Sequence, residues 1–245
     1  EVTLLIAAAA SLEYSMEEKL IPLFEEQNPG VKVEGSYDSS GKLQTQIEEG
    51  MEADLFFSAA TKQMNALTEE GYIKEDSEKK LLENKIVAIV PKDSDLEING
   101  FEDLVKADTI ALGDPASVPA GQYAQEALTS LDLWDAVSVK ASFGTNVTEV
   151  LNWVAEGSAD AGVVYATDAA ARAEDPEGSL EKPVIYPAAI LERTEHSEEA
   201  EAFLTFLQSE EAGEIFEEYG FTPYKEAEET ETETETNAAS EEVSE

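Results

Sequence analysis

The sequence has 245 residues, a formal net charge of −40 and no cysteine. Because 42% of the residues are apolar, the chain can bury a sizeable core, which excludes disorder throughout. The 55 acidic residues, against 15 basic ones, disfavour binding to nucleic acid or to an anionic membrane surface. The lack of cysteine excludes disulfides, thiolate metal sites and cysteine nucleophiles.

The two ends of the chain differ from its middle. Residues 2–10 form an apolar run that follows no basic segment and is too short to span a bilayer. We interpret this run as a strand leading into a helix, and we expect a leader to have been removed ahead of Glu1. Residues 226–245 contain nine Glu and no basic residue, which predicts a disordered acidic tail.

Between these ends, short apolar runs alternate with longer segments of helical period. This alternation predicts an α/β protein with mostly parallel sheets. The expected strands are 2–7, 31–37, 54–57, 85–90, 109–112, 138–141, 161–165 and 183–186. The expected helices are 12–27, 42–49, 61–70, 120–131, 147–156, 168–173, 198–208 and 209–219.

Two extended runs, 84–91 and 182–189, are flanked by polar or proline residues and suit crossings between two lobes. We therefore expect a discontinuous first lobe made of residues 1–84 and 188–225, and a second lobe made of residues 85–187. The two crossing segments would form the hinge between the lobes.

Four junctions share one design, in which a strand ends in small or hydroxyl residues and a helix begins at once. They lie at Ser11, at Ser40, at Ala120 after Pro119, and at Val147 after Thr145 and Asn146. Each leaves free backbone N–H groups at the positive end of a helix dipole, an arrangement that binds anions. Such helix starts gather at the carboxyl ends of the strands in an open α/β sheet, so all four can face one crevice.

The chemistry of these loops narrows the class of anion. They contain hydroxyls and amides and almost no cations, Lys42 being the exception. Neutral dipoles can hold a fully ionised dianion without a counter-charge, whereas a ligand that brings a proton needs an acceptor. The composition therefore favours molybdate, tungstate or sulfate over phosphate.

Sequence blocks spread in order over residues 2–224 resemble those of the periplasmic molybdate-binding protein family. The blocks are Ala8-Ala9-Ala10-Ser11-Leu12, Tyr37-Asp38-Ser39-Ser40-Gly41, Ala53-Asp54-Leu55-Phe56-Phe57-Ser58-Ala59, Gly113-Asp114-Pro115, Val118-Pro119-Ala120-Gly121-Gln122-Tyr123-Ala124, Asn146-Val147, Gly162-Val163-Val164-Tyr165-Ala166-Thr167-Asp168-Ala169, Tyr186-Pro187-Ala188-Ala189, Ile215-Phe216 and Tyr219-Gly220-Phe221. The resemblance implies a two-lobed periplasmic-binding-protein fold of class II with a ligand cleft between the lobes.

Carried over by motif position, the resemblance also implies the ligand contacts. Ser11 and Ser40 would bind the oxyanion through hydroxyl and backbone N–H, Ala120 and Val147 through backbone N–H, and Tyr165 through its phenol. The metal would be held only as molybdate or tungstate through these residues, with no free-cation site and no cofactor.

The same resemblance implies a function without catalysis. The protein would be the extracytoplasmic substrate-binding protein of an ABC importer, either periplasmic or anchored to the cell surface, and would deliver molybdate or tungstate to a membrane permease. We expect a monomer. Asp38 departs from the family pattern, in which a small residue is common, and we expect its carboxylate to face away from the ligand.

Other interpretations stay open at this point. Sulfate or another tetrahedral oxyanion suits the same fold, because a sequence does not measure cavity size. Taken singly, Ser11 and Ser40 are ordinary helix caps and Tyr165 is a core aromatic residue. A serine hydrolase is the rival class, but the only histidine, His196, lies in a late polar segment and no Gly-x-Ser-x-Gly motif surrounds either serine.

Overall fold

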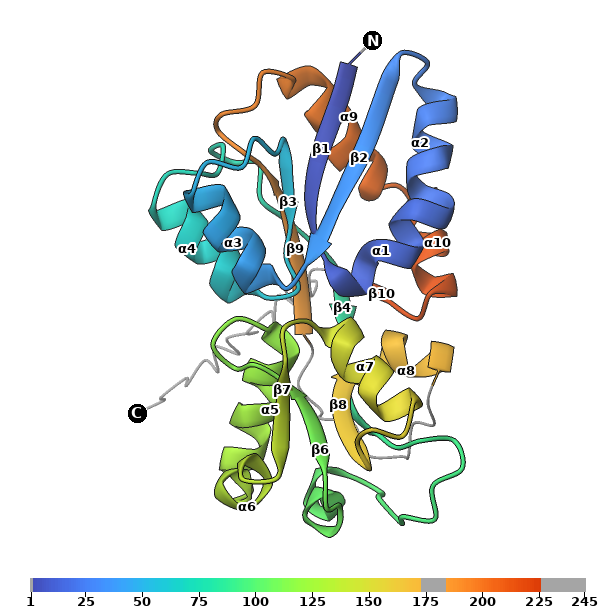
Figure 1. The fold of residues 1–245 in the computed structure, drawn as a ribbon. Helices are drawn as coiled ribbons and strands as arrows, with labels where there is room; N and C mark the ends of the chain where they lie inside the picture. The colour runs from blue at the N-terminus through green and yellow to red at the C-terminus, as the bar shows by residue number, and fades with distance from the viewer. Residues whose placement is uncertain (1, 173–183, 226–245) are drawn as a thin grey trace, which may run out of the picture.

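The computed structural model describes residues 2–172 and 184–225, so the predicted acidic tail, residues 226–245, lies outside the described residues. The described chain forms two α/β lobes, each built on its own sheet, with one lobe above the other in Figure 1. We call the lobe with the six-stranded sheet the first lobe and the lobe with the four-stranded sheet the second lobe.

The sheet of the first lobe has the strand order β10-β4-β9-β3-β1-β2. Strand β1 pairs in parallel with β2 and β3, whereas β9 is antiparallel to β3 and β4, and β10 is antiparallel to β4. The bounds are β1 Val2–Ala9, β2 Val31–Asp38, β3 Leu55–Phe57, β4 Lys79–Asn84, β9 Val184–Ile190 and β10 Thr222–Pro223.

The sheet of the second lobe has the order β5-β8-β6-β7, in which β6 is parallel to β7 and β8, and β5 is antiparallel to β8. Its strands are β5 Ile86–Ile89, β6 Ile110–Gly113, β7 Ala141–Gly144 and β8 Ala161–Tyr165. The sheets are therefore mixed rather than mostly parallel. The reason is that β5 and β9 each begin where the chain has just crossed from the other lobe, so both run away from the junction.

The helices of each lobe pack on its own sheet. Those of the first lobe are η1 Ala10–Leu12, α1 Glu13–Ser15, η2 Met16–Leu20, α2 Ile21–Gln27, α3 Ser40–Glu48, α4 Thr61–Glu69, α9 Ser197–Leu207 and α10 Glu210–Glu218. Those of the second lobe are η3 Phe101–Lys106, α5 Pro119–Ser130, α6 Trp134–Ser138, α7 Val147–Ala155 and α8 Ala166–Arg172.

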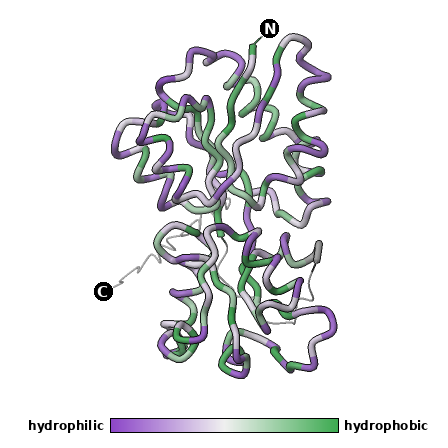
Figure 2. The backbone as a smooth tube through the Cα atoms, in the orientation of Figure 1, coloured by the Kyte–Doolittle hydropathy of each residue, from purple (hydrophilic) through white to green (hydrophobic). Residues whose placement is uncertain are grey.

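Strand β1 is buried on both faces, which explains its nearly continuous apolar sequence. On one face Leu4, Ile6 and Ala8 belong to the main core, which includes the phenylalanines of α2, α9 and α10. On the other face Ala7 packs with residues of α3 and α4 in a smaller core. Figure 2 shows the resulting pattern, with apolar strands inside and polar segments on the outer helices.

Several local features of the structure differ from the prediction, among them the first helix, one strand and β4. The single helix expected over 12–27 is divided into 3-10, α and π segments, because Pro22 has no N–H to continue the regular ladder. The strand expected over 138–141 is wrong, since α6 ends at Ser138 and β7 begins at Ala141. Strand β4 was not expected, because its first residues are lysines and only its pairing with β9 makes it a strand.

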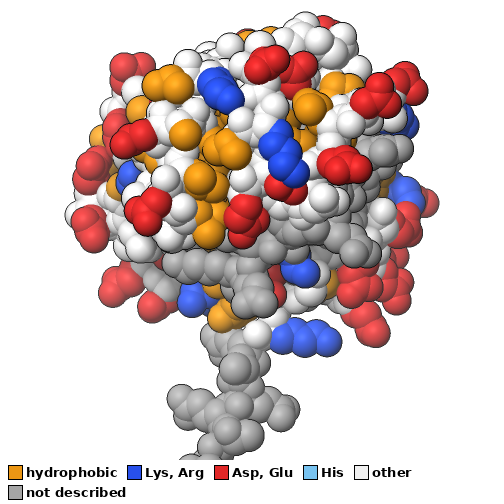
Figure 3. All heavy atoms as spheres, turned by 90° about the horizontal axis from the view of Figure 1, so that it is seen from below, with side chains coloured by type: hydrophobic (Ala, Val, Ile, Leu, Met, Phe, Trp, Pro, Cys, Tyr) orange, Lys and Arg blue, Asp and Glu red, His pale blue; other side chains and the backbone are white. Residues whose placement is uncertain are grey.

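Acidic side chains are scattered around the end of the molecule seen from below in Figure 3, with apolar side chains gathered between them. This distribution agrees with the sequence, in which the excess of acidic residues extends well beyond the tail. Within residues 2–172 and 184–225, no helix combines the length and the apolar content needed to cross a membrane.

Candidate functional site

The four predicted helix starts lie where the two lobes meet (Figure 1). In the first lobe, β1 runs into η1 at Ser11, and β2 runs into α3 at Ser40. In the second lobe, the loop after β6 leads into α5 next to Ala120, and the loop after β7 leads into α7 at Val147. Carboxyl ends of parallel strands from both lobes therefore face one another across the junction, where a ligand of an open α/β sheet binds.

Ser40 is not the cap of its helix. The N-cap of α3 is Ser39, whose Oγ accepts a hydrogen bond from the Lys42 backbone N–H at 3.4 Å. Ser40 is fully buried, and its Oγ accepts a hydrogen bond from the backbone N–H of Ala59 at 2.9 Å. Because that bond uses an acceptor position of the hydroxyl, the Ser40 proton is left to be donated to another group.

Ser11 does not cap its helix either. Residue Ala9 precedes η1 without a side-chain cap, and Ser11 Oγ lies 2.9 Å from the phenol oxygen of Tyr186 on β9. The Tyr186 ring packs edge to face against the ring of Tyr165, with centroids 5.6 Å apart. Tyr186 therefore connects Ser11, from the first lobe, to Tyr165, from the second.

The phenol of Tyr165 is a buried group without a hydrogen-bond partner among the described residues. Burial raises the pKa of Tyr165 well above its ordinary value, and the neighbouring Tyr186 adds to the effect. The phenol therefore keeps its proton at neutral pH and can act only as a hydrogen-bond donor to an anion. A bound oxyanion would accept a hydrogen bond from this buried, unpaired donor at the junction.

Ala120 and Val147 lie in the first turns of α5 and α7 and are both buried. First-turn amides have no acceptor within their own helix, so these backbone N–H groups are available at the junction. The N-cap of α7 is Asn146, whose Oδ1 accepts from the Glu149 N–H at 2.9 Å, as the sequence predicted. Sequence reasoning thus placed both helix starts correctly.

The lobes touch directly beside these residues. The backbone N–H of Gly41 in α3 donates a 2.9 Å hydrogen bond to the carbonyl of Ser117, in the loop before α5. A Cβ added at Gly41 would lie 2.3 Å from that carbonyl oxygen, so the approach requires glycine. This contact brings the start of α3 next to the start of α5, and hence Ser40 towards Ala120.

The Asp38 carboxylate is engaged by its own loop. Its carboxylate accepts from the Ser39 N–H at 2.8 Å and forms an ion pair with Lys42 at 3.4 Å. The negative charge of Asp38, next to Ser39 and Ser40, is therefore balanced by Lys42, which is the one cation that the sequence places among the junction loops.

An open groove of about 500 Å³ lies between the lobes. Ala10, Glu13 and Tyr37 line it from the first lobe, and Asn146 and Glu149 are among its residues from the second. The carboxylates of Glu13 and Glu149 thus line this open groove. The Glu149 carboxylate accepts hydrogen bonds from the N–H and the hydroxyl of Thr145. All five predicted contact residues are buried instead, at 9% exposure or less.

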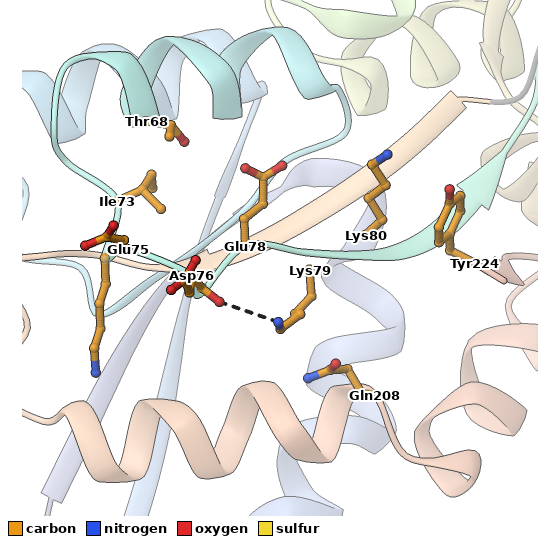
Figure 4. Close-up of a pocket in the computed structure, with 10 residues that line it drawn as sticks. Thr68, Ile73, Glu75, Asp76, Glu78, Lys79, Lys80, Gln208 and Tyr224 are labelled. Carbon is orange, nitrogen blue, oxygen red and sulfur yellow. Dashed lines mark hydrogen bonds between the residues drawn. The ribbon is translucent and has the colours of Figure 1, made fainter. Parts of the chain in front are cut away.

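A second cavity, of about 730 Å³, lies in the first lobe and is a poor anion site (Figure 4). Its lysines are already engaged: Lys74 pairs with Glu201, Lys79 donates to the Asp76 carbonyl, and Lys80 lies over the Tyr224 ring. Carboxylates from Glu75, Asp76 and Glu78 also line it.

His196 lies elsewhere, in a cavity of about 340 Å³ with Asp54 and Arg193, and is not the hydrogen-bond partner of Ser11 or Ser40. Neither serine therefore has the neighbouring histidine that a serine nucleophile needs. Within the described part of the chain, no group of three or more His, Cys, Asp or Glu side chains is placed to hold a metal ion.

Comparison with known proteins decides the family. Residues 4–222 match the bacterial extracellular solute-binding protein family. The chain belongs to this family. The Bacillus subtilis (strain 168) protein YvgL, whose name describes an ABC transporter substrate-binding lipoprotein, is 42% identical over 227 residues, which cover 91% of this chain and 87% of YvgL.

A protein from Haemophilus influenzae, named the molybdate-binding protein ModA, is 36% identical and is matched over 89% of each chain. The structure of a periplasmic molybdate-binding protein from Azotobacter vinelandii superposes with a TM-score of 0.80 at 24% identity, covering 91% of this chain and all of that one. The predicted two-lobed fold is confirmed by these matches. Membership of a solute-binding protein family also confirms that the chain binds a solute and is not an enzyme.

Sequence reasoning missed three polar side chains at the junction. Tyr186 and Asn84 form hydrogen bonds around Ser11, and Asp168 carries a buried carboxyl oxygen without a partner among the described residues. Asn84 and Tyr186 lie in the two segments that were expected to cross between the lobes. A polar residue inside an otherwise apolar crossing segment was the one sign in the sequence that these residues belong to the site.

Proposed function

We propose that this protein is the extracytoplasmic substrate-binding protein of an ABC importer for molybdate or tungstate. The observation that supports this most is the donor set at the junction, in which buried hydroxyls, a buried phenol and helix-start amides come from both lobes. The one cation among the described junction loops, Lys42, is already paired with Asp38. A dianion held by neutral donors in a desolvated site forms strong, charge-assisted hydrogen bonds. The molybdate-binding name of the Haemophilus influenzae relative supports the same ligand.

In the proposed mechanism, the oxyanion enters the groove between the open lobes. Ser11 and Ser40 hold it from the first lobe, and Ala120, Val147 and Tyr165 hold it from the second. Closure about the crossing segments, with lobe boundaries near residues 84 and 187, excludes water and brings Gly41 against Ser117. No covalent bond forms or breaks.

The closed form is then recognised by a membrane permease. We place the protein outside the cytoplasm, either free in a periplasm or attached to the cell surface by a lipid, and we expect it to act as a monomer. Docking would use the faces of both lobes beside the groove, because closure changes how these two faces lie relative to each other.

The test is a calorimetric titration of the purified chain with molybdate, tungstate, sulfate and phosphate in parallel. Molybdate and tungstate should bind most tightly, and at about 100-fold saturation the ligand should add roughly 2.7 kcal/mol to the stability of the folded state. Binding of none of the four anions would overturn the proposal.

Sulfate is the second candidate, because a set of neutral donors suits any fully ionised tetrahedral dianion. Tighter binding of sulfate than of molybdate in the same titration would assign the protein to sulfate import instead. Phosphate should bind most weakly, since the five proposed contact groups are placed to donate and none of them offers an acceptor for its proton.

A further inference from the structure

A buried hydrogen-bond network surrounds Ser11 and extends beyond the five proposed contact residues. The phenol oxygen of Tyr186 lies 2.9 Å from Ser11 Oγ and 3.2 Å from Asn84 Nδ2. Asn84, the last residue of β4, also donates from Nδ2 to the hydroxyl of Thr167 in α8 at 3.1 Å. The network thus runs from the first lobe through the crossing segment to the second.

The orientation of the Asn84 amide is fixed by its other end. Asn84 Oδ1 accepts a hydrogen bond from the backbone N–H of Lys85 at 2.8 Å, so the atom that faces Tyr186 is the NH2 group. An amide NH2 group only donates. The oxygen of Tyr186 therefore accepts from Asn84, and its one proton has to point elsewhere.

Ser11 Oγ and the Tyr165 phenol are the two hydroxyl groups that interact with the Tyr186 phenol among the described residues. Ser11 Oγ, at 2.9 Å, has the geometry of a hydrogen-bond acceptor for the Tyr186 proton, whereas the Tyr165 oxygen does not. Burial raises the pKa of Tyr186 far above neutral pH, so the phenol keeps this proton. Ser11 is thus the acceptor in its bond with Tyr186, and the proton of the Ser11 hydroxyl is free to point into the site. The Ser40 hydroxyl is likewise held as a donor, because its oxygen accepts a hydrogen bond from the Ala59 N–H.

We infer that Asn84 and Tyr186 are positioning residues that orient the Ser11 hydroxyl as a donor, and that they thereby select fully ionised oxyanions over oxyanions that carry a proton. The inference rests on the proposed function and adds a cause for its selectivity. A hydroxyl that is free to turn can accept a hydrogen bond from the P–OH group of monohydrogen phosphate, whereas a hydroxyl that already accepts a hydrogen bond from Tyr186 is held as a donor. The selectivity therefore depends on two residues that need not touch the ligand.

The first test is Tyr186→Phe, which keeps the ring and removes the hydroxyl whose hydrogen bond Ser11 accepts. At about pH 8, molybdate, sulfate and most phosphate are all dianions, so a ratio of affinities cancels their common charge. We expect the molybdate affinity to fall about tenfold, as for the loss of one charge-assisted hydrogen bond, and the ratio of molybdate to phosphate affinity to fall by at least as much. Phosphate is measured by displacement of molybdate.

A second variant, Asn84→Asp, reverses the network with little change of shape. The carboxylate accepts the Tyr186 proton, so Ser11 has to donate to Tyr186 and presents a lone pair to the ligand. The added charge weakens binding of every dianion, but the molybdate-to-phosphate ratio should still fall. This variant tests the inference separately if the Phe variant melts too early to titrate.

The matched control is Tyr219→Phe, which removes a phenol that donates to the Glu18 carboxylate at 2.7 Å on the surface of the first lobe. The control should leave both affinities unchanged. A ratio that stays constant in Tyr186→Phe and Asn84→Asp, whatever happens to the separate affinities, would show that the network only packs the site. If the wild-type chain binds no oxyanion, the proposed function is wrong and this inference falls with it.

Discussion

Replacing Asp168 by asparagine should stabilise the folded protein more strongly as the pH rises. The Asp168 Oδ2 atom is shielded from solvent and has no hydrogen-bond partner among the described residues, although the residue as a whole is only partly buried. Burial raises the pKa of this carboxyl from 3.8 to about 7, and a hydrogen bond from the Tyr165 backbone offsets part of the rise. When ionised, the Asp168 carboxylate in turn raises the pKa of the nearby Tyr165 and Tyr186 phenols.

The sign follows from where the proton is held. Between pH 3.8 and about 7 the folded state keeps a proton on Asp168 that the unfolded state has lost, so stability falls as the pH rises through this window. Each pH unit inside the window costs about 1.4 kcal/mol. Because asparagine cannot ionise, the advantage of Asp168→Asn over the wild type should grow by about 3 kcal/mol between about pH 5 and about pH 8.

Urea unfolding of both proteins across this pH range measures the difference directly. The control is Asp160→Asn, which removes the same charge from the second lobe. Hydrogen bonds from Thr109 lower the pKa of Asp160, so this carboxylate is ionised in both states throughout the range, and its effect on stability should not change with pH. An Asp168→Asn advantage that is equally independent of pH would show that the Asp168 carboxylate is ionised in the folded protein and would refute the reasoning.

Three further substitutions test the site and the core. Gly41→Ala places a Cβ 2.3 Å from the Ser117 carbonyl oxygen, so oxyanion affinity should fall at least tenfold while solution scattering shows a more open molecule; unchanged affinity would mean that this contact is not needed for binding. Ser40→Ala should weaken binding by about 1.5–3 kcal/mol in calorimetry and also leave the Ala59 N–H without its acceptor, whereas full affinity would reduce Ser40 to a structural role. Phe216→Ala removes a fully buried ring that packs against Phe57 and should cost about 3–5 kcal/mol in urea unfolding, with a loss under about 1 kcal/mol pointing to a core that collapses around the gap.

The fold was predictable where local chemistry and long-range packing agree. Asn146 caps α7, and successive apolar residues of β1 point to opposite faces and fill two cores. Both elements were therefore found from the sequence. The strand expected over 138–141 failed because Val137 and Val139 alternate with polar residues although they lie in a helix and a turn, where Val137 is buried and Val139 is 82% exposed. Pattern alone does not distinguish that exposed valine from one facing a core.

In the candidate site too, residues marked by local sequence could be predicted, whereas contacts between distant parts of the chain could not. Ser11, Ser40, Ala120 and Val147 could be named because each follows a strand and starts a helix, which is information contained in a few neighbouring residues. Tyr186 lies 175 positions from Ser11 along the chain, and no local pattern predicts their 2.9 Å contact. Direct contact of the lobes at Gly41 is likewise a property of the assembled fold.

The proposed site also explains how an acidic protein can select an anion without a cation in the pocket. Surface carboxylates act through water and salt, which screen them over roughly 8 Å, whereas buried hydroxyl and amide dipoles act at hydrogen-bond distance in a low dielectric. A lysine placed at the junction would have many carboxylates of its own chain to pair with, as Lys42 does with Asp38. Neutral donors such as the Tyr165 phenol do not form such pairs, and their protons stay in place because burial raises the pKa. In a chain of net charge −40, donors without charge are therefore the groups that can remain free for a dianion.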